Sequence, residues 1–230
     1  MKNDVIAFIP ARSGSKRLPL KNYLIIDGKS ILKRTCETVL ESSIFDEIIV
    51  STDNLALAKE VIGNLDGVHV VERSEILSSD SASVDEVISD YFKKCKKDAD
   101  ICCIYATNIL LKSQTLRKSH LLYTQSPASG LMGISRYRYK LGKALRKADD
   151  GTLTHLFPEN SKIKTQYLED FYVSNGTFYW SSIKNLRKFG SLVTPNQRGI
   201  EIDDLEVCDL DTKNDLEELK VKLAINESKS

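Results

Sequence analysis

The amino-acid sequence predicts a Rossmann-like α/β fold, in which helices flank a mainly parallel sheet. Three observations lead to this prediction. Short apolar runs alternate along the chain with longer amphipathic stretches, which is the pattern of repeated strand–helix units. One run, Ile101–Tyr105, is typical of strands buried on both faces of a parallel sheet. The 230 residues, 41% hydrophobic and 28% charged, can bury a core as one domain with an elaboration.

A basic loop follows the first predicted strand. The apolar run Val5–Ile9 stops at Pro10, and Gly14 lets the following backbone approach a ligand closely. Four cations lie close together here, with Ser13 and Ser15 as further donors: Arg12, Lys16, Arg17 and Lys21. This charge suits a polyphosphate, although charge alone is equally consistent with a solvated basic turn. The loop is neither a G-x-x-x-x-G-K-[ST] phosphate loop nor a G-x-G-x-x-G dinucleotide motif.

The elements after this loop place it at one edge of the sheet. Predicted helices cover residues 31–40, 55–62 and 84–94, and predicted strands cover 47–50 and 68–71. Ser30 is expected to cap the first helix, and Ser83-x-x-Glu86 is a capping box that opens the third. Ligands bind beyond the carboxyl ends of parallel strands. The basic loop, the turn at 51–53 and Arg73 are therefore expected to meet there.

The second half of the chain continues the alternation and then interrupts it. A helix is predicted at 114–123, a strand at 130–134 and a last helix at 214–225. From Arg136 the sequence becomes basic and rich in tyrosine, with Asp149-Asp150-Gly151 as a hairpin turn. Such a tract can bind nucleic acid, but a single short tract in a chain of net charge +1 argues against it. Residues 226–230 are expected to be disordered.

Two aspartates near the C-terminus are candidates for a metal site. If the segment around Leu210 is extended, Asp209 and Asp211 lie on one face, where two carboxylates repel each other unless a cation joins them. Mg²⁺ suits one or two carboxylates together with substrate phosphates. The alternative is that these residues only precede the last helix, with Thr212 as its cap.

Composition argues against several classes of protein. The net charge of +1, from 33 basic and 32 acidic residues, gives no overall field toward nucleic acid or an anionic membrane. No apolar run approaches the ~20 residues that cross a bilayer, and the N-terminus lacks a signal-peptide pattern, so we expect a cytoplasmic protein. The five cysteines have no C-x-x-C spacing, which argues against a zinc site or a disulfide framework. The three scattered histidines suggest no histidine-based mechanism.

The basic loop also resembles a family signature. The stretch Ile9–Asn22 matches I-P-A-R-x-G-S-K-R-[LI]-P-x-K-N of the acylneuraminate (CMP-nonulosonic acid) cytidylyltransferases, and it looks most like their pseudaminic acid branch. Asp209–Thr212 matches the D-[LI]-D-T metal motif of that family. Two stretches depart from it. Ala106–Leu110 lacks the second proline of P-T-x-P, and Ser174-Asn175 stands where relatives have something like D-A in D-A-G-Q-F-Y-W.

The resemblance implies a nucleotide-diphospho-sugar transferase fold and a nucleotidyltransferase activity. The enzyme would join a nonulosonic acid, in first place pseudaminic acid, to the CMP of CTP and release pyrophosphate, for cell-surface glycan or flagellin glycosylation. Mg²⁺ would be the cofactor, held by Asp209 and Asp211, and catalytic roles would fall to Arg12, Lys21 and Asp211. The implied CTP site is Ala11, Arg12, Ser15, Lys16, Lys21, Asn22, Arg73 and Ser83, and the implied sugar-acid site is Thr107, Lys140 and Tyr179.

The resemblance also implies a homodimer and a plan of domains. Residues 1–135 would form the nucleotide-binding core, 136–173 a dimerisation and substrate-closing extension, and 174–225 the return to the core with the metal site. One alternative is the same reaction on N-acetylneuraminic, legionaminic or 3-deoxy-manno-octulosonic acid. A more distant alternative is a glycosyltransferase-like or non-catalytic nucleotide-binding protein.

Overall fold

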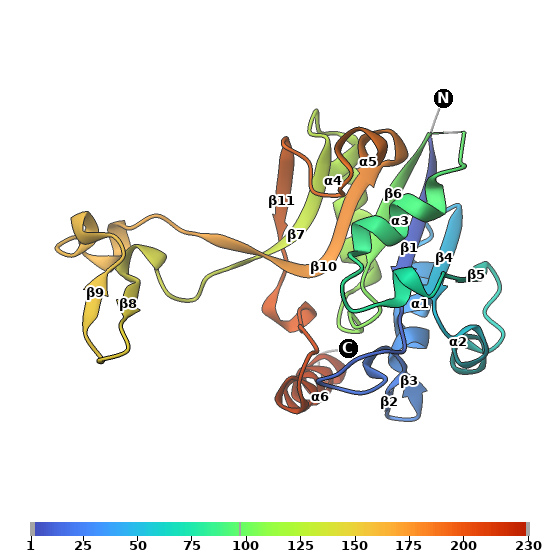
Figure 1. Cartoon of the computed structure of the whole chain (residues 1–230), viewed down its shortest axis with the longest axis horizontal. Coiled ribbons are helices and arrows are strands. Elements are labelled where there is room, and N and C mark those ends of the chain that lie inside the picture. The colour runs from blue at the N-terminus through green and yellow to red at the C-terminus, as the bar shows by residue number, and fades with distance from the viewer. Residues whose placement is uncertain (1–2, 97, 229–230) are drawn as a thin grey trace.

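The computed structural model describes residues 3–96 and 98–228, and its centre is a seven-stranded sheet (Figure 1). The strand order is β11-β7-β10-β6-β1-β4-β5. Neighbouring strands are parallel except that β10 runs antiparallel to both β6 and β7, so the predicted, mainly parallel sheet is confirmed. The strands are β1 (Asp4–Pro10), β4 (Glu47–Thr52), β5 (Val68–Glu72), β6 (Ala99–Ile104), β7 (Gly130–Arg136), β10 (Tyr172–Ser182) and β11 (Gln197–Glu201).

Helices cover both faces of this sheet. One face carries α1 (Ile31–Ser42), α2 (Leu55–Ile62) and α4 (Ser113–Thr124), and the other carries α3 (Val84–Phe92) and α5 (Ile183–Phe189). The central strand β1 has apolar side chains for both cores, because alternate residues of a strand point to opposite faces. A sheet covered in this way leaves the carboxyl ends of its strands for ligands.

A third apolar cluster joins the basic loop to the C-terminal part of the chain. It contains Leu18 from the loop, Leu210, and Leu219 from α6 (Lys213–Glu227). Leu210 and Leu219 are fully buried. The small hairpin of β2 (Ile25–Ile26) and β3 (Lys29–Ser30) packs against the same cluster. The cluster therefore holds the segment that carries Asp209 and Asp211 close to the loop that carries the cations.

Local sequence signals determine where several helices begin. The Ser30 hydroxyl accepts a hydrogen bond from the backbone N–H of Lys33 (3.1 Å), and Ser83 forms its capping box with Glu86. The helix predicted at 55–62 is α2, with the same bounds. α6 continues through Glu227, so the first two residues of the tail predicted to be disordered are helical, and Ser228 is the C-cap. The rest of that predicted tail, 229–230, lies outside the described residues.

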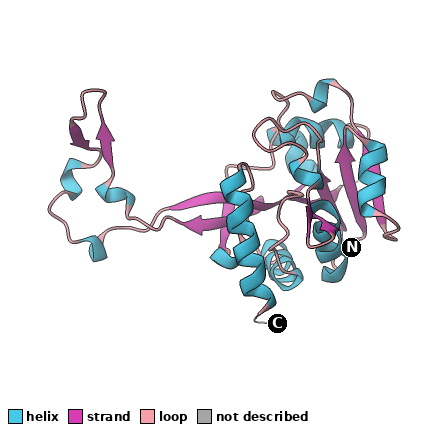
Figure 2. Ribbon diagram, turned by 90° about the horizontal axis from the view of Figure 1, so that it is seen from below, coloured by secondary structure: helices cyan, strands magenta, loops and turns pink. Residues whose placement is uncertain are grey.

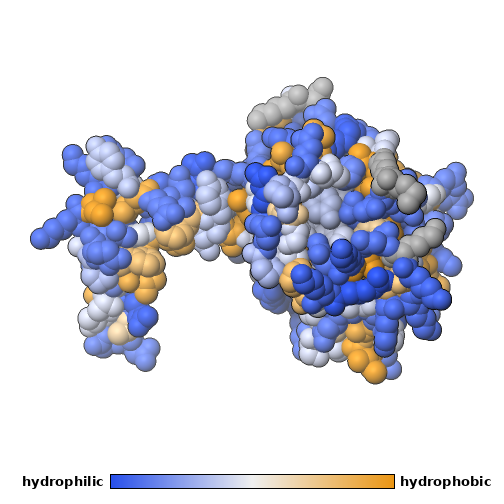
Figure 3. All heavy atoms as spheres, turned by 90° about the horizontal axis from the view of Figure 1, so that it is seen from above, coloured by the Kyte–Doolittle hydropathy of each residue, from blue (hydrophilic) through white to orange (hydrophobic). Residues whose placement is uncertain are grey.

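Between β7 and β10 the chain leaves the core as an arm, residues 137–171 (Figures 1 and 2). At its base Tyr172 is the register partner of Arg136. At its tip, β8 (Leu145–Lys147) and β9 (Leu153–His155) form a hairpin over the predicted turn at residues 149–151. Figure 3 shows hydrophobic and hydrophilic residues side by side on the surface of the arm. The large apolar side chains exposed on the arm include Tyr139, Leu145, Leu153, Leu156 and Tyr167.

The remaining elements are short 3₁₀ turns. They are η1 (Lys21–Tyr23), η2 (Ile76–Ser78), η3 (Leu141–Lys143), η4 (Pro158–Asn160), η5 (Thr165–Tyr167) and η6 (Asp204–Glu206). Among the described residues, none of the helices combines the length and the apolar character that crossing a membrane requires.

Candidate active site

The basic loop is held at the carboxyl end of β1 by the turn that follows β4. Asp53 accepts hydrogen bonds from the backbone N–H of Ser13 (2.7 Å) and from the Ser13 hydroxyl (2.9 Å). The side chain of Asn22 closes the loop from its other end by donating to the Arg12 carbonyl (2.8 Å). The loop and the 51–53 turn thus lie side by side. This was predicted, because both segments follow the carboxyl ends of parallel strands.

Tyr23 anchors the start of the loop through hydrogen bonds of its side-chain hydroxyl. Its buried hydroxyl lies 2.7 Å from the Ala11 carbonyl and 2.6 Å from the Thr52 hydroxyl. Burial raises the pKa of this phenol, so that it stays protonated and able to donate. Ala11 itself is fully buried, its backbone N–H donates to the Ser51 carbonyl (2.8 Å), and it is not among the residues that line the hollows described below.

Two adjoining hollows meet at the loop. The first, of about 260 Å³, collects five residues of the predicted CTP and sugar-acid sites: Arg12, Lys21, Asn22, Arg73 and Thr107. The second, of about 370 Å³, is lined by Ser15, Lys16, Arg17 and Asp211. Arg12, Lys21 and Asp80 line both. The structure therefore places a partly apolar cavity next to a strongly cationic one, with shared cations at the junction.

Arg73 brings a partly buried positive charge to the first hollow. Its guanidinium donates to the Ser51 carbonyl (2.6 Å), and its backbone N–H donates to the Thr52 carbonyl (2.8 Å). Its Nε is buried and has no hydrogen-bond partner among the described residues. Burial lowers the pKa of Arg73, because a desolvated guanidinium is less stable as a cation. An anionic or carbonyl-bearing ligand in the hollow would relieve this cost.

Asp80 is a site residue that the sequence did not reveal. One carboxylate oxygen lies 2.8 Å from Arg12 Nη1 and the other 2.7 Å from Lys16 Nζ. Hydrogen bonds from Lys16 and Arg12 lower the pKa of Asp80. Asp80 belongs to an exposed serine-rich stretch with no motif of its own, and only the three-dimensional contact with the basic loop distinguishes it.

Asp211 pairs with the other two cations of the loop. Lys21 Nζ lies 2.7 Å from one carboxylate oxygen and Arg17 Nη2 lies 2.5 Å from the other. The hydrogen bond from Lys21 lowers the pKa of Asp211. Burial, and then the charge of Asp211, raise the pKa of Asp209. Leu210 between them is buried, so the segment is anchored by its middle residue.

These two aspartates are a pair and not part of a larger ligand cluster. Within residues 3–96 and 98–228, no three His, Cys, Asp or Glu side chains are grouped so that they could hold a metal ion. Two carboxylates supply hard oxygen ligands for a cation that takes its remaining ligands from water and substrate.

The three predicted sugar-acid residues are not gathered in one place. Thr107 lines the first hollow, whereas Tyr179 lines a neighbouring cavity of about 240 Å³ together with Ser83, a residue predicted for the CTP site. Tyr105 lines both cavities, and its ring centroid lies 5.9 Å from that of Tyr179. Lys140 lies in the arm, where it donates to the Leu168 carbonyl (3.1 Å) and pairs with Asp170.

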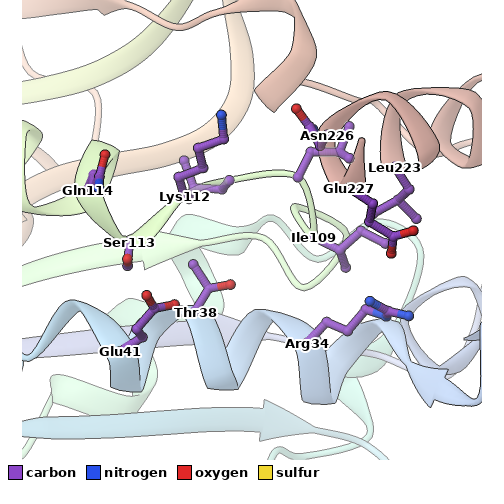
Figure 4. Close-up of a pocket in the computed structure, with 12 residues that line it drawn as sticks. Arg34, Thr38, Glu41, Ile109, Lys112, Ser113, Gln114, Leu223, Asn226 and Glu227 are labelled. Atoms are coloured by element: carbon purple, nitrogen blue, oxygen red, sulfur yellow. The ribbon is translucent and has the colours of Figure 1, made fainter. Parts of the chain in front are cut away.

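A separate groove of about 470 Å³ lies between α1, α6 and the segment that leads into α4 (Figure 4). Arg34 and Glu41 line it from α1, and Lys112 lines it from the opposite side. It contains none of the predicted site residues, so we assign the active site to the hollows at the basic loop.

Comparison with known proteins identifies the family. The family model described as Cytidylyltransferase matches residues 6–222. The chain belongs to the cytidylyltransferase family. The predicted family and the predicted class of enzyme, a nucleotidyltransferase, are thereby confirmed.

Relatives of this cytidylyltransferase differ in the acid that their names specify. A pseudaminic acid cytidylyltransferase of Campylobacter jejuni is 29% identical over 230 residues and covers 98% of both chains. An N-acylneuraminate cytidylyltransferase of Streptococcus agalactiae is 27% identical over 212 residues, which are 91% of this chain and 51% of the relative. A CMP:2-keto-3-deoxy-manno-octonic acid synthetase complexed with CTP shares the fold, with a TM-score of 0.71 at 15% identity over 97% of this chain and 99% of that one.

Proposed function

We propose that this cytidylyltransferase joins a nonulosonic acid, in first place pseudaminic acid, to the CMP of CTP and releases pyrophosphate. The observation that carries the proposal is the pair of adjoining hollows that share Arg12 and Lys21. One has room and apolar lining for a nucleoside, and the other has the cations for a triphosphate. The similarity to a pseudaminic acid cytidylyltransferase over 98% of the chain supports the choice of acid.

The cations of the basic loop would hold the triphosphate. Transfer of a nucleotidyl group requires the polyphosphate to be held still and its charge neutralised while a hydroxyl attacks in line with the departing pyrophosphate. Arg12, Lys16 and Lys21 would supply this charge, and Ser15 a further donor. Arg73 and Asn22 would complete the nucleotide site in the first hollow. Arg12 and Lys21, which border both hollows, are expected to lie nearest to the phosphate that reacts.

Asp209 and Asp211 are the residues that would hold Mg²⁺. The donor set fits this ion, because both groups are carboxylates. Burial and then the charge of Asp211 raise the pKa of Asp209, and a cation between the two carboxylates would relieve their repulsion. When bound there, the ion would neutralise phosphate charge and lower the pKa of the attacking hydroxyl. In the structure Arg17 and Lys21 pair with Asp211, and both side chains would turn toward phosphate as the nucleotide binds.

The arm would pair with a second copy of the chain, giving a homodimer. It carries exposed apolar side chains on a thin projection that has no core of its own among the described residues, and such surface is typical of interfaces. Lys140 lies in this arm, so it would reach an acid bound in the partner's site, while Thr107 and Tyr179 would face the acid in their own subunit.

The test is pyrophosphate release from CTP and Mg²⁺ with pseudaminic, legionaminic, N-acetylneuraminic and 3-deoxy-manno-octulosonic acids, with mass analysis of the products. Turnover with pseudaminic acid is the expected result. Preferred turnover with another acid would support the proposed reaction and replace pseudaminic acid as the proposed substrate. Binding of CTP without pyrophosphate release from any of them would contradict the proposal.

A further inference from the structure

The two stretches in which this chain departs from the family pattern meet in the structure. Asn108 is buried, with 3% of its surface exposed, and its side-chain amide donates to the carbonyls of Gly176 (2.8 Å) and Thr177 (2.8 Å). One amide thus satisfies two backbone acceptors that lie 68 and 69 residues further along the chain.

These acceptors belong to a bulge in β10. The register of β10 against β7 shifts between Ser174 and Tyr179, and Gly176 has a φ of +67°, which a glycine adopts without strain. The side-chain Oδ1 of Asn175 accepts from the backbone N–H (3.2 Å) and the hydroxyl (2.7 Å) of Thr177, which closes the bulge on itself. Gly133 of β7 gives it room, since a Cβ there would lie 2.0 Å from the Thr177 hydroxyl.

The bulge in turn sets the position of the Tyr179 phenol. The Ser174 hydroxyl lies 2.6 Å from the Tyr179 hydroxyl, and the two residues flank the bulge. Tyr105 supports the same arrangement, because its ring lies against Gly176 and against the Tyr179 ring. Tyr179 therefore reaches its cavity with its hydroxyl oriented by a residue from the far side of the bulge.

The loop that carries Asn108 does not depend on this amide for its own shape. Its backbone forms turns from Asn108 N–H to the Tyr105 carbonyl (3.0 Å) and from Leu111 N–H to the Asn108 carbonyl (3.2 Å). The Thr35 hydroxyl also donates to the Ala106 carbonyl (2.8 Å). Loss of the Asn108 amide would therefore release the bulge more than the loop that lines the nucleotide hollow.

We infer that Asn108 is a positioning residue for acceptor recognition, which acts by fixing the 174–177 bulge and thereby the Tyr179 hydroxyl. Ser174 and Asn175 are the other half of the same unit. This inference rests on the proposed function, in which Tyr179 faces the acid. The two departures from the family pattern then have one shared role, which is to position Tyr179 for the acid. This role does not involve the nucleotide site.

The test compares Asn108→Ala with the matched control Asn185→Ala. Asn185 also donates its amide to a backbone carbonyl, that of Ser129 (2.8 Å), and it is not among the residues that line the hollows of the active site. Asn108→Ala should speed hydrogen exchange in residues 172–182 and raise the KM for the acid about tenfold, while the KM for CTP stays within about twofold. Asn185→Ala should leave both KM values and the exchange of residues 174–179 unchanged.

Tyr179→Phe gives the second arm of the test. If Asn108 acts through the Tyr179 hydroxyl, Asn108→Ala should add almost nothing to the KM for the acid in the Tyr179→Phe background. Unchanged exchange at the bulge, equal rises in both KM values, or additive effects in the double variant would overturn the inference. Failure of the proposed function looks different, because the unmodified enzyme would then turn over none of the acids.

Discussion

Two carboxylates flank the basic loop, and each pairs with two of its cations. Asp80 forms ion pairs with Arg12 and Lys16, whereas Asp211 forms ion pairs with Lys21 and Arg17. In both cases the pairing lowers the pKa of the carboxyl group. By charge pairing alone the two aspartates are equivalent.

Their surroundings differ. Asp211 has Asp209 as a second carboxylate two residues away, lies next to the buried Leu210, and its backbone N–H donates to Asp215 in the capping box of α6 (3.0 Å). Asp80 lies in an exposed loop. The comparison teaches that a candidate metal site is defined by paired carboxylates on an anchored backbone, while a single carboxylate among cations is a counter-charge that phosphate can replace.

Removing Asp211 should have the largest effect. Asp211→Ala should lower kcat more than about a hundredfold, because a metal ion held there would supply several kcal/mol of charge stabilisation in the transition state. CTP binding should be largely kept, since Arg17 and Lys21 are released for phosphate. Steady-state kinetics and calorimetric titration with CTP measure the two quantities. Retained turnover would remove Asp211 from the metal site.

Asp209→Asn should weaken the metal site while leaving the ion pairs of Asp211 in place. We expect the Mg²⁺ concentration for half-maximal rate to rise about tenfold or more, as when one charged ligand of a hard cation becomes neutral. A chelator should abolish the activity of the unmodified enzyme, and added Mg²⁺ should restore it. An unchanged Mg²⁺ requirement in Asp209→Asn would exclude Asp209 as a ligand of the metal.

Asp80→Asn should have a smaller effect of the opposite sign. Arg12 and Lys16 no longer share a carboxylate, so CTP should bind about threefold more tightly at low salt, with the gain shrinking as salt screens it. Asp66→Asn, which removes the same charge at an exposed position away from the loop, is the control. Weaker CTP binding in Asp80→Asn would mean that Asp80 orients these cations and does not compete for them.

The cap beneath Asp211 should give the smallest effect. Thr212→Ala removes the hydroxyl that accepts from the backbone N–H of Asp215 (3.4 Å), which should cost about 1 kcal/mol of folding free energy. Ser30→Ala removes a similar cap from α1 and is the control. Chemical denaturation should show similar losses in both, and only Thr212→Ala should also raise the Mg²⁺ requirement. Equal Mg²⁺ requirements would show that the cap stabilises α6 without shaping the metal site.

The sequence predicts best those features that depend on residues close together in the chain. The caps at Ser30, Ser83 and Thr212 depend on residues within one turn and are found as predicted. The family could be predicted because Ile9–Asn22 is a contiguous signature. The pairing of Asp80 with Arg12 joins residues 68 positions apart, and nothing in either segment signals it. The antiparallel course of β10 and its clamp by Asn108 depend in the same way on tertiary contacts.

The register at the base of the arm has a consequence for how proteins of this kind can change over time. Arg136 and Tyr172 face each other across two neighbouring strands, so everything between them is an insertion into a single hairpin. A two-residue turn could join the same strand ends without moving any residue of the core into another register. The arm is therefore one contiguous insertion. Evolution or an engineer can lengthen, shorten or exchange it in one step without changing the phosphate-binding loop.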